Sequence, residues 1–166
     1  MKKLFVIVCV LLLAFGSFAQ KAKFGHVDSQ AIFSVMPEKD AASKAVEEYA
    51  MTLESQLQAL NAELEQKYND YMENQETLSP SIKTMKEEEL VNLQQRIQAF
   101  QVSAQEDMQV KEMELLEPIY TKIQDAIKEV GEENGFIYIF EVSTLLFYSS
   151  ESVDVTPIVK TKLGII

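Results

Sequence analysis

Apolar side chains between residues 38 and 79 recur with a period of eleven residues. They follow one another in steps of three, four and four, at Val46, Tyr49, Leu53, Leu57, Leu60, Leu64, Tyr68 and Tyr71. Such spacing places them on one face of a helix, and an eleven-residue repeat corresponds to about 3.67 residues per turn. The segment is otherwise rich in strong helix formers such as Ala, Glu, Gln, Leu and Lys. The pattern predicts a long helix over Glu38–Ser79, about 60 Å in length, in a helix pair that is nearly straight or slightly right-handed.

A second helix with a related pattern is expected from Pro80 to Val130. Its apolar rows are Ile97, Met108, Ile119 and Val130, together with Leu93, Ala104, Leu115 and Ala126. Three polar residues interrupt the pattern, namely Gln101, Lys111 and Glu112, so the contact in the middle of the helix pair should be loose. The two helices would form an antiparallel hairpin, a coiled-coil arm at residues 38–130.

Proline and glycine mark the expected ends of these helices. Ser79-Pro80 is the predicted tip, because proline disfavours helical geometry at the preceding residue and is suited to the first helical turn. Pro118 lies within a continuing apolar pattern, which predicts a kink or local break near residues 114–117. No glycine occurs between His26 and Val130, and Gly131 is expected to end the second helix together with Gly135.

Short strands are predicted on both sides of the hairpin, at residues 23–28, 136–142 and 145–150. They would form a small β-body from residues 20–37 and 131–166. A core of this size is marginal, and the last two predicted strands are apolar on both faces, so cover by a partner is expected. The fold class is therefore α+β, with a helical arm on a self-associating β-body. The candidate oligomer core is Phe136, Tyr138, Phe140, Leu146 and Phe147.

The first 19 residues have the three-part pattern of a cleaved secretory signal. Lys2 and Lys3 precede an apolar run over residues 4–14, and Ser17-Phe18-Ala19 forms a small-x-small cleavage site. The apolar run is shorter than the ~20 residues of a membrane-spanning helix. Cys9, the single cysteine, lies inside this segment, so the processed chain would have no disulfide and no thiolate metal ligand.

The charge of the chain is strongly negative and concentrated in the predicted arm. The full sequence has a formal net charge of −11, and residues 38–130 alone contain 20 acidic and 9 basic residues. Nucleic acid is a poor partner for such a surface, because phosphate binding needs clustered Lys and Arg. Stable insertion into a membrane is not expected, and anionic membrane surfaces are disfavoured for the same electrostatic reason.

No constellation of catalytic, cofactor-binding or metal-ligating residues is evident. His26 and Asp28 share a strand face, but no third ligand or nucleophile accompanies them. We therefore expect no enzymatic activity and no cofactor. Four apolar residues near the tip are candidate contacts for a varied apolar client, because methionine adapts to different surfaces. They are Met72, Leu78, Ile82 and Met85. The alternative is that they only close the core of the hairpin.

Several short motifs, in order along the chain, resemble the Skp/OmpH family of chaperones. The motifs are Phe24-Gly25-His26-Val27-Asp28-Ser29-Gln30 leading to Met36-Pro37-Glu38, Glu117-Pro118-Ile119-Tyr120, Glu132-Glu133-Asn134-Gly135-Phe136 and Val153-Asp154-Val155-Thr156. The resemblance implies a periplasmic homotrimer whose helical arms surround a cavity. It also implies ATP-independent holding of unfolded outer-membrane proteins during transit.

The acidic arms depart from the usual family pattern. The resemblance associates positively charged arms with clients, lipopolysaccharide and lipid, and this sequence has no basic cluster to which a lipopolysaccharide site could be assigned. Two functions are therefore compared: a holdase for unfolded outer-membrane proteins, and a structural coiled-coil spacer or adaptor of the cell envelope. A holdase tolerates an interrupted apolar stripe, whereas a rigid spacer should have a continuous one.

Overall fold

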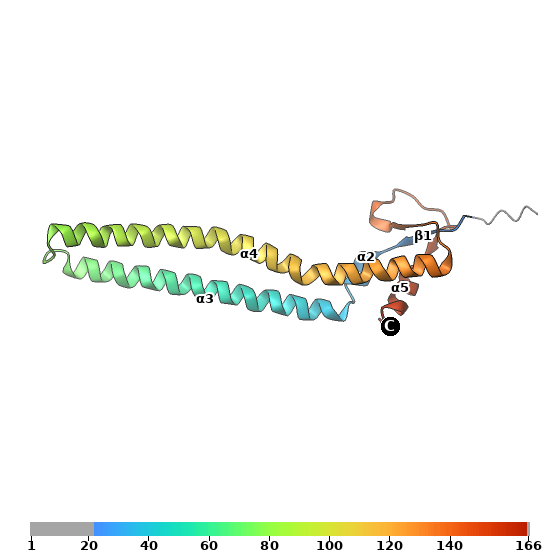
Figure 1. Cartoon of the computed structure of the whole chain (residues 1–166), viewed down its shortest axis with the longest axis horizontal. Coiled ribbons are helices and arrows are strands. Elements are labelled where there is room, and N and C mark those ends of the chain that lie inside the picture. The colour runs from blue at the N-terminus through green and yellow to red at the C-terminus, as the bar shows by residue number, and fades with distance from the viewer. Residues whose placement is uncertain (1–21, 166) are drawn as a thin grey trace, which may run out of the picture. The chain divides into compact units, whose positions relative to one another are not determined.

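The computed structural model describes residues 22–165, so the predicted signal segment at residues 1–19 lies outside the described residues. The elements, in chain order, are β1 (Phe24–Val27), α2 (Ser29–Phe33), α3 (Pro37–Asn74), α4 (Pro80–Asn134), β2 (Tyr138–Glu141), a 3₁₀ turn η1 (Val142–Thr144), β3 (Val153–Asp154) and α5 (Thr156–Lys162) (Figure 1). The fold class is α+β, as predicted. The described chain divides into two compact units, an arm unit of residues 30–125 and a body unit of residues 22–29 with residues 126–164.

Within the arm unit, α3 lies side by side with the part of α4 up to residue 125 and runs in the opposite direction (Figure 1). The predicted helical hairpin is confirmed. Pro37 is the first residue of α3 and follows Met36, which has extended backbone geometry. This start fits the preference of proline for the first helical turn, where its missing N–H is not needed.

The turn of the hairpin is longer than the sequence predicted. Helix α3 ends at Asn74, whereas the proline at position 80 predicted an end at Ser79. The carbonyl oxygen of Asn74 accepts hydrogen bonds from the backbone N–H and the hydroxyl of Thr77, and these bonds close the turn. The carbonyl oxygen of Ser79 then accepts from the N–H of Lys83, the first helical hydrogen bond of α4. The hydroxyl of Thr77 thus bonds to the backbone at the end of α3, and the helix stops three residues after Tyr71, the last residue of its apolar pattern.

Helix α4 continues through Pro118, so the predicted local break is not observed. Figure 1 shows α4 changing direction where its colour passes from yellow to orange, around residues 105–120. Proline removes one helical hydrogen bond and crowds the preceding turn, and neighbouring turns absorb this by bending.

The end of α4 corrects a second prediction. Gly131 lies inside the helix, which ends only at Asn134. Gly135 has a φ of 67° and is the residue that reverses the chain. The N–H of Phe136 donates to the carbonyl of Gly131, and the N–H of Gly135 donates to that of Glu132. This pair of bonds is a Schellman motif, in which glycine supplies the left-handed residue after the helix.

The body unit contains a three-stranded parallel sheet in the order β2-β1-β3. On one side of β1, Phe24 pairs with Tyr138 of β2, and on the other side Gly25 pairs with Val153 of β3. The strand predicted at residues 145–150 is not formed. Because β2 and β3 are both parallel to β1, the chain must return along the sheet between them. Residues 142–152, which include η1, make that return, and the last strand is Val153–Asp154.

A small core holds the sheet to α5. Val27, Val155 and Val159 are buried, and the hydroxyl of Thr156 accepts a hydrogen bond from the N–H of Asp28 at 3.0 Å. The carboxylate of Glu141 accepts from the N–H of Ser29 at 3.2 Å and 3.3 Å. These bonds satisfy the backbone beyond the end of β1, where the strand ladder stops.

Candidate functional surfaces

The four predicted tip residues surround the turn between α3 and α4. Met72 is 46% exposed, Ile82 38% and Met85 54%, while Leu78 is half-buried in the turn. The side-chain amide of Gln75 reaches the sulfur of Met72 at 3.9 Å. Three of the four side chains therefore present apolar surface to solvent, and a contact role for them stays a prediction.

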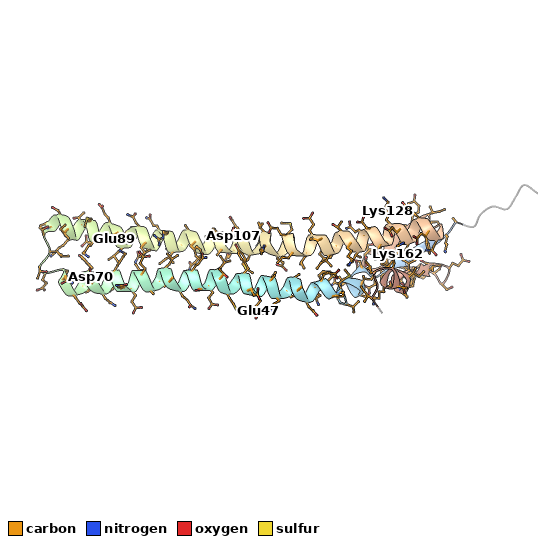
Figure 2. All side chains as sticks on the ribbon, turned by 60° about the horizontal axis from the view of Figure 1, so that its bottom comes forward. Glu47, Asp70, Glu89, Asp107, Lys128 and Lys162 are labelled. Carbon is orange, nitrogen blue, oxygen red and sulfur yellow. The ribbon has the colours of Figure 1, made fainter. Side chains whose placement is uncertain are left out.

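Below the tip, polar side chains pair across the two helices. Lys67 contacts Glu89 at 2.5 Å, Lys86 contacts Asp70 at 2.6 Å, and the hydroxyl of Tyr71 donates to Glu87 at 2.5 Å. Figure 2 shows Asp70 and Glu89 at the same end of the hairpin, on α3 and α4 respectively. This set of pairs was not identified from the sequence. The sequence could have indicated these pairs only through the antiparallel register of the hairpin, in which residues at equal distances before and after the turn face each other.

These contacts shift the titration of their members. The hydrogen bond from Lys67 lowers the pKa of Glu89, and the bond from Lys86 lowers the pKa of Asp70. Accordingly, the bond to Glu89 raises the pKa of Lys67. Acidic side chains near the tip are thus partly neutralised by partners on the facing helix.

In the middle of the arm unit the two helices leave a groove of about 620 Å³. Its apolar lining consists of Ala50, Leu53, Leu57, Phe100, Ala104 and Met108. Glu54 and three glutamines, Gln101, Gln105 and Gln109, supply the polar lining. All residues of α4 from 98 to 118 are described, and none of them is buried. The loose mid-arm contact predicted from the interrupted stripe is confirmed.

A second groove, of about 370 Å³, lies beside Pro118. Ala41 and Ala42 of α3 line it together with Leu115 and Ile119 of α4. Lys122 pairs with Glu38 at this groove, and the hydrogen bond from Lys122 lowers the pKa of Glu38. The well-packed part of the arm unit adjoins this region, where the ring of Phe33 stacks on Tyr120 with centroids 4.8 Å apart.

Four of the five candidate oligomer residues are exposed on the body unit. Leu146 and Phe147 are 106% and 82% exposed, and Tyr138 and Phe140 on β2 are 59% and 44% exposed. Phe136 is half-buried beneath the ammonium group of Lys23, which lies 4.1 Å from its ring centroid. Residues 145–150 do not pair into the sheet, and Leu146 and Phe147 are left exposed to solvent. Their role in assembly stays a prediction.

His26 has a structural environment in the body unit. Its side chain is buried, its Nδ1 lies 2.8 Å from the hydroxyl oxygen of Ser152, and its ring lies against Tyr148 with centroids 4.2 Å apart. Within residues 22–165, no three His, Cys, Asp or Glu side chains are arranged to hold a metal ion. Over the same range, no helix combines the length and apolar character of a membrane-crossing segment.

Comparison with known proteins places this architecture in a family. The family model described as "Outer membrane protein (OmpH-like)" matches residues 23–163. The chain is 25% identical to the chaperone protein Skp of Yersinia enterocolitica over 146 residues, which cover 88% of each protein. It is 28% identical to the chaperone protein Skp of Photorhabdus luminescens over 136 residues, covering 81% of this chain and 82% of that one.

A solved structure supports the fold independently. The crystal structure of an OmpH-like outer membrane chaperone from Caulobacter crescentus superposes with a TM-score of 0.72 at 12% sequence identity. The match covers 86% of this chain and 83% of the other. A long helical hairpin, a small parallel sheet and a family match over nearly the whole described chain agree with one another: this chain belongs to the OmpH-like family of outer membrane proteins, whose relatives include the Skp chaperones.

Proposed function

We propose that the protein is an ATP-independent holdase of the periplasm, which binds unfolded outer-membrane proteins and keeps them soluble in transit. Family membership supports a chaperone, and the loosely packed arm unit is the observation that carries the mechanism. Its helices expose apolar side chains far from either end, with Met51 59%, Val102 60% and Met113 62% exposed. Many weak contacts of this kind hold an unfolded chain without fixing its conformation and without an energy source.

The proposal includes a homotrimer assembled through the body unit. Both β2 and β3 are edge strands of a three-stranded sheet, and unpaired strand edges favour pairing with another chain. The exposed aromatic residues Tyr138 and Phe140 lie on one of these edge strands. Burying them between copies would supply the apolar core that a body of this size needs.

The predicted signal at residues 1–19 would direct export to the periplasm and then be cleaved from the chain. We propose no enzymatic activity and no lipopolysaccharide site. The arm helices contain Glu47 and Glu88 in addition to the paired acids, and Figure 2 shows Glu47 on the side of α3 that faces away from α4. A surface of this charge repels anionic headgroups. The same charge keeps the arms soluble while their apolar side chains are exposed.

The alternative is a structural spacer of the cell envelope. A rigid spacer requires continuous packing along its helices, because gaps let the helices bend and separate. The groove of about 620 Å³ in the middle of the arm unit interrupts that packing. The holdase is therefore the better-supported function.

A dilution assay tests the proposal directly. A denatured outer-membrane porin is diluted from urea with and without the purified protein, and light scattering reports aggregation. We expect suppression at stoichiometric amounts without ATP. If the folded oligomer leaves aggregation unchanged, the spacer function is favoured instead.

A second assay tests the tip. Replacing Met72, Leu78, Ile82 and Met85 with serine should weaken client holding without changing the helical circular-dichroism signal, if these side chains contact clients. Asn92→Ser with Gln94→Ser, two exposed polar positions elsewhere on α4, serves as the control. Loss of helical signal in the tip variant would show that the four residues only close the hairpin.

A further inference from the structure

The middle of the arm unit is almost free of charge, although the arm as a whole is strongly acidic. On α3, Glu54 is the single charged residue between Tyr49 and Ala62. On α4, Arg96 is the single charged residue between Leu90 and Gln105. In most of the remaining arm, acidic residues occur every few positions. A stretch of low charge on both helices of one hairpin requires an explanation beyond helix formation, which charged residues support equally well.

Two cross-helix contacts show that these stretches face each other. Arg96 contacts Glu63 at 3.2 Å on the side toward the tip. The ammonium group of Lys111 lies 6.0 Å from the ring centroid of Tyr49 on the opposite side. The groove of about 620 Å³ opens between these two contacts, so the low-charge zone and the gap in packing coincide.

The lining of the groove suits an extended polypeptide. Leu53, Leu57 and Phe100 provide an apolar floor, and Met108 adds a side chain that adapts its shape. Each glutamine on the rim has both donor and acceptor atoms, so it can bond to the N–H and C=O groups of an unpaired strand. A volume of this size lies within the range of binding pockets for small ligands and single peptide segments.

Charge narrows the choice of occupant. Glu54 is the one charged residue of the groove lining, and Glu106 and Asp107 follow the low-charge zone on α4. A second copy of the arm would bring an equally acidic surface, and like charges oppose its approach. A basic segment would be attracted by the same field.

We propose that this mid-arm groove binds extended apolar client segments whose polar positions are basic or neutral, and that it selects against acidic ones. The inference rests on the proposed holdase function and adds the class of segment and its place of contact. Apolar side chains of the client enter the groove, while its basic side chains approach Glu54 and the acidic helix surfaces on either side.

Tryptophan fluorescence tests the groove, because the natural sequence contains no tryptophan. Gln105→Trp places a reporter on the rim, and Ser103→Trp places a control two residues away, outside the groove lining. Two peptides with the same alternating apolar residues, one with lysine and one with glutamate at the polar positions, are titrated into the full oligomer. We expect a blue shift only in Gln105→Trp, and affinity for the lysine peptide higher by about tenfold or more at low salt.

A blocking variant makes the test independent of the reporter. Ala104→Phe fills the groove from its floor and should weaken lysine-peptide binding in a competition assay, whereas Ser103→Phe should not. Equal affinities for the two peptides, equal shifts at positions 103 and 105, or undiminished binding by Ala104→Phe would each overturn the proposal. A blue shift of the Gln105→Trp fluorescence that grows with protein concentration in the absence of peptide would instead show that a second copy of this chain occupies the groove.

The porin assay separates this inference from the holdase proposal. If wild-type protein suppresses aggregation and Ala104→Phe does so equally well, the groove assignment fails while the holdase function stands. If wild-type protein does not suppress aggregation, the holdase function itself fails.

Discussion

Gly131 and Gly135 stand four residues apart near the end of α4 and have opposite structural roles. Gly135 has a positive φ of 67°, a conformation that costs about 1–2 kcal/mol in residues with a Cβ atom. Gly131 lies inside the helix, where glycine is less favourable than alanine by about 0.5–1 kcal/mol. A Cβ atom at Gly131 would meet only the Cδ1 atom of Ile139, at 3.4 Å.

The two glycines should therefore respond oppositely to substitution by alanine. Gly135→Ala is expected to lower the free energy of unfolding by about 1–2 kcal/mol, through backbone strain alone, since no atom lies within 4 Å of the added Cβ. Gly131→Ala is expected to leave that free energy unchanged or to raise it by up to about 1 kcal/mol. Urea denaturation followed by circular dichroism measures both, and equal effects would contradict the assignment of Gly135 as the helix terminator.

Asp154 links the stability of the body unit to pH. Desolvation is the largest single influence on its pKa and acts to raise it. The hydrogen bonds from Thr156, with smaller effects of His26 and Lys160, outweigh desolvation, and the net pKa is lowered. A carboxyl whose pKa is depressed in the folded state contributes stability above its unfolded pKa of about 3.9, and this contribution is lost as pH falls through the folded value.

Asp154→Asn keeps a side-chain oxygen that can accept the hydrogen bond from the N–H of Thr156, but it removes the titratable carboxyl group. Between about pH 5 and about pH 3, wild-type protein should lose more stability than this variant. Thermal melts at several pH values provide the measurement, with Asp125→Asn as a control at an exposed acid for which the structure gives no such bond. Parallel melting curves for wild type and Asp154→Asn would show that the bond does not couple stability to pH.

Local chemistry made some residues predictable from the sequence and left others outside its reach. Proline and the eleven-residue repeat gave the starts and faces of the long helices, because both act through backbone geometry within a few positions. The strand predicted at residues 145–150 failed, since a parallel sheet obliges the chain to return before β3 can pair. In the sequence, the mid-arm groove was indicated only by the interruption of the apolar stripe at Gln101. Its volume depends on how closely α3 and α4 pack, which the sequence pattern does not give.

At the scale of one element, α4 retains an internal proline that a straight helix would not favour. Pro118 lacks the N–H that would donate to the carbonyl of Glu114, and it lines the groove of about 370 Å³ beside Ala41 and Ala42. The proline therefore both weakens the helix and shapes a surface that faces α3.

Pro118→Ala should stabilise α4, because it restores the missing hydrogen bond and relieves crowding in the preceding turn. A proline in a helix interior costs up to about 3 kcal/mol, and the bend already accommodates part of this, so a gain of about 1–2 kcal/mol is expected. Thermal unfolding monitored at 222 nm measures it, and Glu117→Ala controls for the introduction of alanine at the neighbouring position. A lower melting temperature for Pro118→Ala would show that the packing of the proline ring beside α3 outweighs its backbone cost.

At the scale of the whole molecule, the proposed trimer accounts for aromatic surface that a soluble single chain would not retain. Exposed apolar patches mark sites of association, and Leu146 with Phe147 are the most exposed large apolar residues described. Phe147→Asp should dissociate the oligomer and lower its stability, because a carboxylate buried between copies loses its hydration. Sedimentation velocity measures the mass, with Phe24→Asp as a comparison at a less exposed aromatic of the body unit. A stable, well-folded monomer would contradict the argument that the body needs a partner to complete its core.

The parallel sheet also sets the order in which the protein can fold. Its central strand β1 is among the first elements to emerge, but its two neighbours are more than a hundred residues further along, with Phe24 paired to Tyr138 and His26 to Asp154. Such distant pairing is slow, because the ends of a long intervening chain must first meet. The helical hairpin can form earlier, because it can start at its turn, where the paired Asp70 and Lys86 are 16 residues apart, and extend from there. A chain truncated before Val153 could thus fold its arm helices but could not complete the sheet. Only full-length chains could then associate through the body unit.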